Sequence, residues 1–575
     1  MNLKAAFQHE GYRLTEGAQG DLFSLQTISL EQVKNSEACF TLILEADAPF
    51  LLAIGNQPAY SLWPDMDIIR LDAKCGGFPV RIHPVGMVKD DDGTRKADIL
   101  LDKDHLYVDS GKTLQVFFRI LISREATSGH HTGTIGLHGR KALGDEETLS
   151  LMPFSLVIRD VVLPHPEKWR FHLDLWQHLS NIARKHETPL FSDAHFEVAG
   201  RYVESLALLG QKAVTVVVTD IPWSGQRTYR NPEKPTDLFE YSMVRTQKGE
   251  NGYVFDYTAM DRYIDLCASH GIGEEIEVFG LTGIWQDPDM GYGNPSDFPD
   301  GLRVRYLDMK TGTYRYMRKK EDILIFIRSL HDHFLRLGLM DKVRVIADEP
   351  SDIGLYRETL RQVKKAGPLF RFKTAINHAE FTREFKEDIS DLVPSLECLT
   401  NKRDISLIRE MAEDPRKRIS WYVCCTPPAP NTFLRSPLYE SRFICLYTLF
   451  MGLKGFLRWN YTAWPENPRD DLSFRFPDWS AGDMNFVYPS CNGTPLLSLR
   501  YMALKRGIED YVLIQAAIRI KPCLLNEIQR LIMGKHLPED LDPLQPSYAM
   551  DDATYDQARA KAVDILENMD GGFTF

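Results

Sequence analysis

Long hydrophobic segments are missing from this sequence, and with them the usual marks of membrane and exported proteins. The longest apolar run, Phe443 to Leu453, is too short to cross a bilayer, which takes about 20 residues. The amino terminus lacks the apolar stretch of a secretory signal. Nine cysteines are scattered without paired metal-ligand spacing, which argues against a disulfide framework or a zinc site. These absences predict a cytoplasmic protein with reduced thiols and no membrane partner.

Clusters of basic residues are lacking as well. The formal net charge is -12 and no run of more than three Lys and Arg residues appears, whereas binding to nucleic-acid phosphates requires larger basic clusters. We therefore expect no nucleic-acid partner. Walker loops, Gly-x-Ser-x-Gly elbows and His-Glu-x-x-His motifs are also absent, so phosphate transfer, serine hydrolysis and zinc proteolysis lack support. No metal and no cofactor are expected.

The composition that remains is that of a soluble globular protein, with 43% apolar and 26% charged residues. A chain of 575 residues is too long for one ordinary core, so several domains are expected. Short alternating runs broken by Gly, Asp and Ser predict an antiparallel β-sandwich over residues 1–165. These runs are Phe40 to Leu44, Phe78 to Ile82, Leu114 to Ile122, Thr132 to Leu137 and Leu149 to Val162.

A change of rhythm follows the segment Leu163 to Lys168, whose two prolines indicate a linker. Strand-like and helix-like stretches then alternate over residues 166–495, which predicts a (β/α)8 barrel, with weak strand signals from Ala379 to Arg418. Residues 496–575 are expected to form a helical extension packed on the barrel. The fold class is thus α/β plus all-β. The strands expected in the barrel include Arg170 to Leu175, Ala213 to Thr219, Glu274 to Phe279, Val343 to Ala347, Arg371 to Ile376, Ile419 to Cys424 and Gly455 to Trp459.

Two adjacent acids, Asp348 and Glu349, follow the apolar run Val343 to Ala347 and precede Pro350. The carboxyl ends of barrel strands face the active site, so both acids are candidates for catalysis. Glycoside chemistry requires one group to protonate the leaving oxygen and another to handle charge at the sugar. The alternative is a helix cap, in which Asp348 or Ser351 begins the next helix.

Aromatic and polar residues near the other expected strand ends favour a sugar-binding site. Indole rings stack on the C–H faces of sugars, and hydroxyl groups need polar partners nearby. The neighbouring Cys424 and Cys425 fit packing better than redox chemistry. The candidate substrate-binding residues are His172, Asp174, Trp176, Asp220, Trp223, Trp285, Asn377, Trp459, Asn460, Tyr461, Trp464 and Asp483.

Three stretches resemble glycoside hydrolase family 123 and its wider relatives, a family of β-N-acetylgalactosaminidases with a β-sandwich and a (β/α)8 barrel. They are Val345 to Pro350, which contains the Asp-Glu pair, Gly455 to Tyr461, and Ser498 to Tyr511. The last stretch, preceded by Gly482-Asp483 and Tyr488-Pro489, is the most specific to the wider group and marks fold more than substrate.

The resemblance implies retaining, substrate-assisted hydrolysis of terminal β-linked N-acetylgalactosamine (GalNAc) from an oligosaccharide or a small glycoside. In this scheme the 2-acetamido oxygen of the sugar attacks its own anomeric carbon and forms an oxazolinium ion. Asp348 is expected to orient the acetamido N–H, and Glu349 to act as acid and then base. Because consecutive strand side chains point to opposite faces, both acids reach one sugar only where the strand ends. The protein itself is expected to be a monomer or a homodimer.

Two other functions stay open from the sequence. In one, the hydrolase acts on a different sugar and needs a further carboxylate, with Asp220 and Asp483 as candidates. In the other, the barrel binds glycans without catalysis. The sandwich is expected to brace the barrel rather than to bind sugar.

Overall fold

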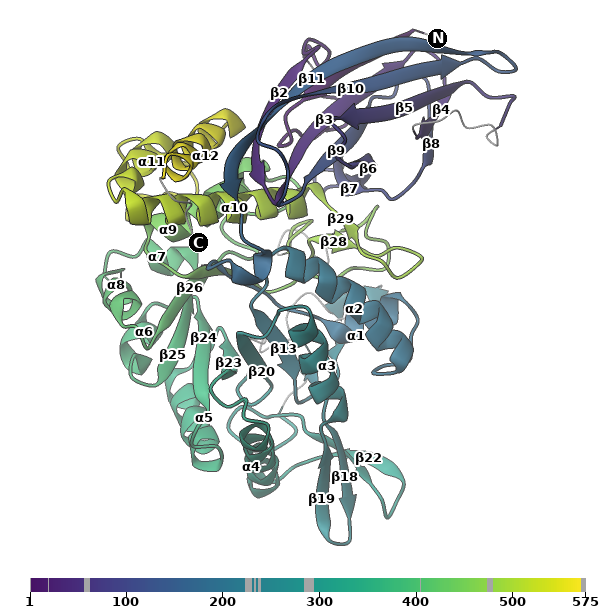
Figure 1. The fold of residues 1–575 in the computed structure, drawn as a ribbon. Coiled ribbons are helices and arrows are strands. Elements are labelled where there is room, and N and C mark those ends of the chain that lie inside the picture. Colours follow the sequence, from purple (N-terminus) through teal and green to yellow (C-terminus); the bar gives the residue numbers. More distant parts are fainter. Residues whose placement is uncertain are drawn as a thin grey trace.

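The computed structural model describes residues 2–18, 20–55, 63–222, 230–231, 234–235, 239–283, 294–403, 405–472 and 479–569. A two-sheet sandwich is followed by a barrel of parallel strands and a group of carboxyl-terminal helices, so the predicted fold class is confirmed. In Figure 1 the sandwich lies above the barrel, and the long helix α10 (Leu499–Ile520) runs between them.

The sandwich consists of a five-stranded and a six-stranded sheet. Its core is built from inward-facing residues such as Phe40 and Phe118, whose rings stack with centroids 4.7 Å apart. Most strand pairs are antiparallel, but β2–β11 and β4–β5 are parallel. In sheet order the strands are β1 (Leu3–Gln8), β3 (Ser36–Ala46), β9 (Leu114–Ile122), β6 (Val80–Lys89) and β7 (Arg95–Leu100), and then β2 (Ile28–Lys34), β11 (Glu146–Val162), β10 (Gly129–Arg140), β5 (Ile68–Cys75), β4 (Phe50–Ile54) and β8 (His105–Val108).

The barrel is an eight-stranded parallel sheet whose first and last members approach each other. The backbone N–H of Lys212 donates to the carbonyl of Leu173 (3.0 Å), and a parallel bridge joins Leu173 to Gln211, so the sheet closes between β12 and β13. In chain order the strands are β12 (His172–Leu175), β13 (Ala213–Val217), β20 (Glu275–Phe279), β23 (Val343–Asp348), β24 (Arg371–Ile376), β25 (Ile389–Pro394), β26 (Arg418–Tyr422) and β27 (Gly455–Arg458).

Helices follow the barrel strands and cover their outer faces (Figure 1). Strand residues that face outward, such as Val214, Val278 and Val345, are buried against the helices in one continuous apolar core. The region that gave weak strand signals contains β25 with three short helices around it. The helices are α1 (Leu179–Lys185), α2 (Asp193–Leu208), α3 (Thr258–Ser269), α4 (Lys320–Arg336), α5 (Ile353–Ala366), α6 (Glu380–Phe385), α7 (Leu396–Leu399), α8 (Ile405–Glu413) and α9 (Tyr439–Phe450).

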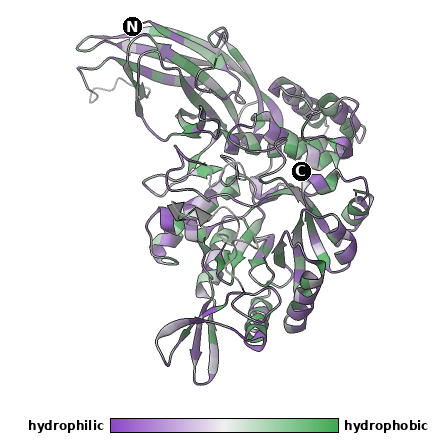
Figure 2. Ribbon diagram, turned by 180° about the vertical axis from the view of Figure 1, so that it is seen from behind, coloured by the Kyte–Doolittle hydropathy of each residue, from purple (hydrophilic) through white to green (hydrophobic). Residues whose placement is uncertain are grey.

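Small ribbons extend from the loops of the barrel. Figure 2 shows that the outlying hairpins at the foot of the molecule are largely hydrophilic, whereas hydrophobic residues concentrate on the barrel strands and the helices that face them. The four-stranded ribbon contains β19 (Gly252–Asp256), β18 (Arg245–Gly249), β21 (Arg305–Asp308) and β22 (Thr313–Tyr316). The two-stranded pairs are β14 (Ile221–Pro222) with β17 (Phe239–Glu240), β15 (Arg230–Asn231) with β16 (Lys234–Pro235), and β28 (Val487–Tyr488) with β29 (Leu496–Leu497).

Buried polar contacts join the sandwich to the barrel. Asp98 on β7 accepts hydrogen bonds from Arg500 Nε (3.0 Å) and from the Tyr488 hydroxyl (2.7 Å). Asp91, in the turn between β6 and β7, accepts a hydrogen bond from the backbone N–H of Ala481 (2.8 Å). A buried charge that loses its partner is strongly destabilising, so these contacts fix the sandwich against α10 and the loops of the barrel.

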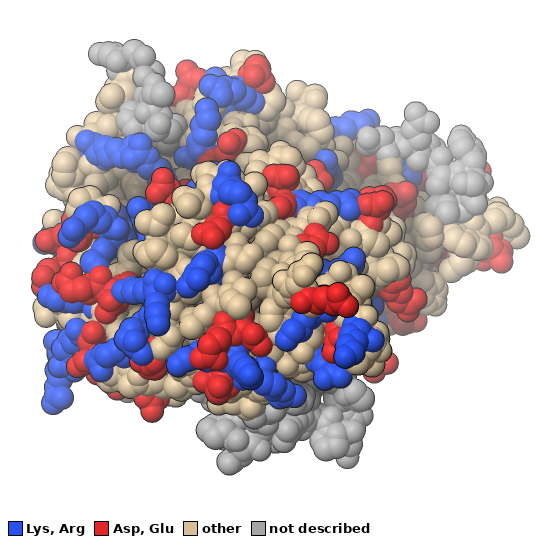
Figure 3. Space-filling model, turned by 90° about the horizontal axis from the view of Figure 1, so that it is seen from below, with Lys and Arg blue, Asp and Glu red and all other residues tan. Residues whose placement is uncertain are grey.

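The remaining helices, α11 (Leu524–Met533) and α12 (Asp552–Glu567), pack against α10. None of the helices in the described ranges combines the length and hydrophobicity needed to cross a bilayer. On the face shown in Figure 3, Lys and Arg are interspersed with Asp and Glu. Among the residues coloured there, no continuous basic surface of the kind that binds nucleic acid is seen.

Candidate active site

Inward-facing side chains of the barrel form layers, because every second residue of each strand points toward the axis. Along β12 the inward residues are His172, Asp174 and then Trp176, which follows the strand. His172 lies at the amino-terminal end, within 3.4 Å of Glu275 and 3.2 Å of Arg418. The interior is therefore charged at its amino-terminal end, and a cluster of apolar side chains fills it nearer the carboxyl ends of the strands.

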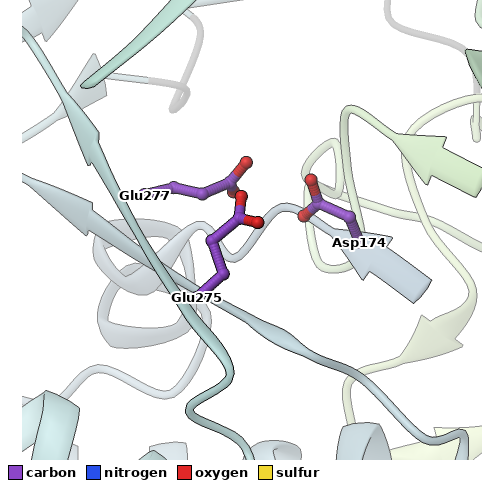
Figure 4. Close-up of side chains that lie close together, drawn as sticks. All are labelled: Asp174, Glu275 and Glu277. Atoms are coloured by element: carbon purple, nitrogen blue, oxygen red, sulfur yellow. The ribbon is translucent and has the colours of Figure 1, made fainter. Parts of the chain in front are cut away.

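The middle layer contains an ammonium group enclosed by three carboxyl groups. Lys373 Nζ lies 2.5 Å from Asp174, 2.8 Å from Glu275 and 2.6 Å from Glu277, and all four side chains are buried. Figure 4 shows the three acids pointing toward one another. Their oxygens are close enough together to hold a metal ion. Lys373 already supplies a positive charge at this point, so the arrangement forms an internal salt bridge within the barrel.

Above these layers, the carboxyl ends of the strands enclose a small cavity of about 210 Å³. Three indole rings and two carboxyl groups line it, together with one amide, one phenol and two thiols. The lining residues are Trp176, Asp348, Glu349, Ala375, Asn377, Tyr422, Cys424, Cys425, Leu457, Trp459 and Trp479.

Asp348 and Glu349 both line this cavity, although strand alternation alone would point them to opposite faces. Asp348 is the last residue of β23 and faces inward, two positions after the inward-facing Ile346. Glu349 has a φ of +47°, which lies in the left-handed region that non-glycine residues rarely adopt. This turn of the backbone redirects the Glu349 side chain from the helix layer toward the cavity. Such conformations cost about 1–3 kcal/mol and are concentrated at functional sites.

The helix-cap alternative for these acids does not hold. Helix α5 begins at Ile353, and its N-cap is Asp352, whose carboxylate accepts the backbone N–H of Leu355 at 2.8 Å. Asp348 belongs to the strand, and Ser351 precedes the cap. The Asp-Glu pair is therefore available for chemistry in the cavity.

Two side chains hold the Glu349 carboxyl in place. The Tyr422 hydroxyl donates to Oε1, and the Asn377 amide donates to Oε2 at 3.0 Å. Burial raises the pKa of Glu349 above its usual range; the Tyr422 hydrogen bond opposes this rise, and the charge of Glu397 adds to it. A raised pKa keeps a larger fraction of Glu349 protonated near neutrality, as a general acid requires.

Trp459, one wall of the cavity, is fixed from behind. Its indole Nε1 donates to Asp483 Oδ1 (3.2 Å), and the same oxygen accepts Arg458 Nη2 (2.8 Å). Trp479 lies on the loop whose Ala481 is bound by Asp91 of the sandwich. Trp176 is buried, and its Nε1 has no hydrogen-bond partner within the described protein.

The structure brings together only part of the candidate set. Asp348, Glu349, Trp176, Asn377 and Trp459 line the cavity, with Asp483 directly behind it. Trp223 and Trp285 lie outside the described residues. The remaining candidates lie outside the lining and contact other parts of the protein. His172 and Asp174 are in the lower layers of the barrel, and Asp220 forms an ion pair with Arg305 (3.0 Å). Asn460 accepts hydrogen bonds from two backbone N–H groups of its own loop, the Tyr461 hydroxyl is hydrogen-bonded to Ser205 (2.6 Å), and Trp464 donates to the carbonyl of Val487 (2.7 Å).

Six residues of the lining lie outside the candidate set: Ala375, Tyr422, Cys424, Cys425, Leu457 and Trp479. Tyr422 was placed within a longer strand, yet β26 ends at this residue, so the rule that selected Asp348 also selects Tyr422. Trp479 lies in the segment between β27 and β28, and none of the strands expected from the sequence ends near it. Hydrogen bonding to Cys425 and burial raise the pKa of the Cys424 thiol well above its usual range, so it stays a neutral, weakly polar group.

Comparison with known proteins identifies the barrel. The model of the catalytic domain of glycoside hydrolase family 123 matches residues 176–517. A solved family 123 glycoside hydrolase from Clostridium perfringens, described in a study of glycolipid glycan hydrolysis, is 19% identical; the match covers 99% of this chain and 98% of that one, with a TM-score of 0.74. At this identity the likeness concerns the fold.

Two further solved structures resemble the chain only weakly. A GH5 xyloglucanase from Bacteroides ovatus matches 86% of this chain and 100% of its own at 8% identity, with a TM-score of 0.26. A GH10 xylanase from termite gut matches 85% and 100% at 9% identity, with a TM-score of 0.31. A search of the curated proteins found no match.

The hydrogen bond from Tyr422 to Glu349 leads to a testable shift in acidity. In Tyr422→Phe the ionised form of Glu349 loses a donor that stabilises it, so the pKa of Glu349 is expected to rise further. Carboxyl ¹³C NMR titration of the labelled protein measures this shift. Tyr447→Phe, which removes a buried hydroxyl bonded instead to the carbonyl of Pro538 (3.0 Å), is the matched control and should leave Glu349 unchanged. An unchanged or lowered pKa of Glu349 in Tyr422→Phe would contradict a stabilising hydrogen bond from Tyr422 to the ionised carboxylate.

Proposed function

The chain belongs to glycoside hydrolase family 123, and from this premise we propose that it removes terminal β-linked GalNAc by retaining, substrate-assisted catalysis. The observation that carries the proposal is the position of the two acids. Among the described residues lining the cavity, Asp348 and Glu349 are the only carboxylic acids, and they are neighbours in the chain. Hydrolases with an enzyme nucleophile instead place two carboxyl groups on either side of the scissile bond.

A sugar that carries its own nucleophile does not need a second enzyme carboxylate on the opposite side of the scissile bond. The acetamido oxygen bonds to the anomeric carbon while the bond from that carbon to the leaving oxygen breaks. Asp348 accepts a hydrogen bond from the acetamido N–H and so holds the carbonyl oxygen in line for attack. Glu349 gives its proton to the leaving oxygen.

The second half of the reaction reverses the role of Glu349. As a carboxylate it takes a proton from water, the oxygen of that water attacks the anomeric carbon, and the oxazolinium ring opens. Two inversions at one carbon give overall retention. The Tyr422 and Asn377 hydrogen bonds stabilise the carboxylate at this stage, while burial favours the acid form at the start.

The lining of the cavity is consistent with a single sugar residue that carries an acetamido group. The cavity volume of about 210 Å³ is below the roughly 300 Å³ at which pockets for drug-sized ligands begin. Trp176, Trp459 and Trp479 offer flat apolar faces for the C–H groups of the ring. The thiols of Cys424 and Cys425 add weakly polar surface suited to a methyl group.

A hydrolase for a different sugar has less support. It would need a further carboxylate as nucleophile or base, and the candidates for that role were Asp220 and Asp483. Asp220 is fully buried against Arg305, and Asp483 is held by Arg458 behind Trp459. Neither is among the lining residues of the cavity.

Replacing the proposed acid tests catalysis against mere binding. Glu349→Gln is expected to lower kcat for an alkyl β-GalNAc glycoside about a hundredfold or more, because an alkoxide leaves poorly without a proton. The loss should be smaller for 4-nitrophenyl β-GalNAc, whose leaving group needs less protonation. Glu384→Gln, an exposed carboxylate paired with Arg357, is the control and should keep full activity. Equal rates for Glu349→Gln and the wild type would exclude Glu349 as the acid, and binding of the glycoside without turnover by the wild type would indicate a non-catalytic glycan-binding protein.

Comparison of two aryl glycosides tests the role of the acetamido group. The 4-nitrophenyl β-GalNAc glycoside is expected to react at least about a hundredfold faster, in kcat/KM, than the β-galactoside, which lacks an internal nucleophile. Asp348→Asn should reduce the β-GalNAc rate and leave the residual β-galactoside rate nearly unchanged. Turnover of both glycosides at similar rates would reject participation of the acetamido group.

A further inference from the structure

Two adjacent thiols, those of Cys424 and Cys425, lie in the wall of the aromatic cavity just after β26. Their sulfur atoms are 3.6 Å apart and share a weak hydrogen bond. Both residues are partly exposed, whereas five of the other seven cysteines are buried. Packing was the role expected for the pair from the sequence, and the structure adds that the two sulfurs lie side by side where a small solute can reach them.

The geometry of this pair is suited to reversible oxidation. We propose that Cys424 and Cys425 form a redox modification site, which a hydroperoxide closes to a disulfide and a small thiol reopens, and that the disulfide form hydrolyses glycosides more slowly. This inference rests on the proposed function and adds a means of regulating the same site.

The oxidation consumes one hydroperoxide for each pair of thiols. The Cys425 sulfur, as its thiolate, attacks one oxygen of the hydroperoxide; the O–O bond breaks, the other oxygen leaves as water or an alcohol, and Cys425 becomes a sulfenic acid. The Cys424 sulfur then loses its proton and bonds to the Cys425 sulfur, while the S–O bond breaks and the oxygen leaves as water. Two electrons pass from the thiols to the hydroperoxide. Two molecules of a small thiol reverse the change by exchange and become a small disulfide.

The surroundings of the two thiols favour this order of attack. Hydrogen bonding to Cys425 and burial raise the pKa of the Cys424 thiol well above its usual range, and the charge of Glu349 adds to the rise. A thiol with a raised pKa supplies little thiolate for the first attack on a peroxide. Cys424 is therefore suited to the second step, in which its partner is already in contact with it.

A disulfide between neighbours in the chain is strained. The Cα atoms of consecutive residues are about 3.8 Å apart across a trans peptide, whereas those of disulfide-bonded residues are usually about 4.4–6.8 Å apart. The sulfurs of Cys424 and Cys425 would also have to close from 3.6 Å to a bond of about 2.0 Å. Strained disulfides are the ones that thiols reduce readily, which a reversible modification requires.

Closure of this ring would disturb the groups that hold one wall of the cavity. The carbonyl of Cys424 accepts hydrogen bonds from Asn431 Nδ2 (3.0 Å) and Arg458 Nη1 (3.4 Å). Arg458 also binds Asp483, which holds the indole of Trp459. A rotation of the peptide group between the two cysteines would therefore be transmitted to Trp459.

The proposed acid is connected to the same segment. Tyr422 ends β26 two residues before Cys424, and its hydroxyl donates to Glu349. A misplacement of about 1 Å in a catalytic site can lower the rate about a hundredfold. The strained ring is thus expected to slow catalysis through the position of Glu349.

Mass spectrometry and kinetics on the full chain test the pair. Brief treatment with hydrogen peroxide is expected to remove two hydrogens from the peptide that contains Cys424 and Cys425, and to lower kcat/KM for 4-nitrophenyl β-GalNAc at least about tenfold. Dithiothreitol should restore both the mass and the rate. The treatment should also move the carboxyl ¹³C resonance of Glu349, a measurement that does not depend on turnover.

Variants separate the pair from the other thiols. Cys425→Ser removes the first nucleophile and is expected to lose the response that dithiothreitol reverses. Cys424→Ala carries the test if that variant fails to fold, because its peptide should gain the oxygen of a sulfenic acid instead of losing two hydrogens. The matched control is Cys491→Ser/Cys523→Ser, which removes the two exposed thiols and should respond as the wild type does.

Two results would overturn the inference. One is a wild-type peptide that does not lose two hydrogens, and the other is a disulfide that leaves both the rate and the Glu349 resonance unchanged. Absence of turnover by the reduced wild type would instead overturn the proposed function. In that case the peptide mass and the Glu349 resonance still decide whether the pair closes and whether the cavity responds.

Discussion

At Glu349 the chain leaves strand β23 with a left-handed φ of +47°, and the convergence of the two acids on one cavity depends on this single conformation. In an extended strand, Asp348 would face the barrel axis and Glu349 the helix layer. The turn brings both carboxyl groups to one cavity, where Tyr422 and Asn377 bind the second of them. Two adjacent residues can then perform different tasks on the same sugar.

The rest of the fold supports this strand end from below and from above. Below it, the salt bridges around Lys373 fill the middle of the barrel with fixed charges, and an apolar layer separates them from the cavity. Above it, the sandwich holds the loop of Trp479 and Asp483 through Asp91, and it holds α10 through Asp98. These contacts join the sandwich to the walls of the cavity, and a bracing role for the sandwich stays a prediction.

Much of the fold was predictable because barrel strands buried on the outer face read as runs of β-branched residues, as in Val343 to Ala347. Strand β25 was not recognised in the sequence because Ser390, Asp391 and Pro394 interrupt its apolar pattern. Asp391 is buried in the folded protein, where it forms an ion pair with Arg344. The two acids, Trp176, Asn377 and Trp459 were identifiable as residues at strand ends. His172 and Asp174 share the inward face of β12 with Trp176. The sequence alone could not show which of these three residues reaches the cavity and which lie in lower layers of the barrel.

The proposed function requires Asp348 and Glu349 to reach one bound saccharide, and a crystal structure with GalNAc-thiazoline, a mimic of the cyclised intermediate, tests this most directly. The predicted result is a sugar ring among Trp176, Trp459 and Trp479, with an Asp348 oxygen about 3 Å from the thiazoline nitrogen and Glu349 beside the anomeric carbon. A ring bound in another part of the molecule, or one that contacts only one of the two acids, would contradict it.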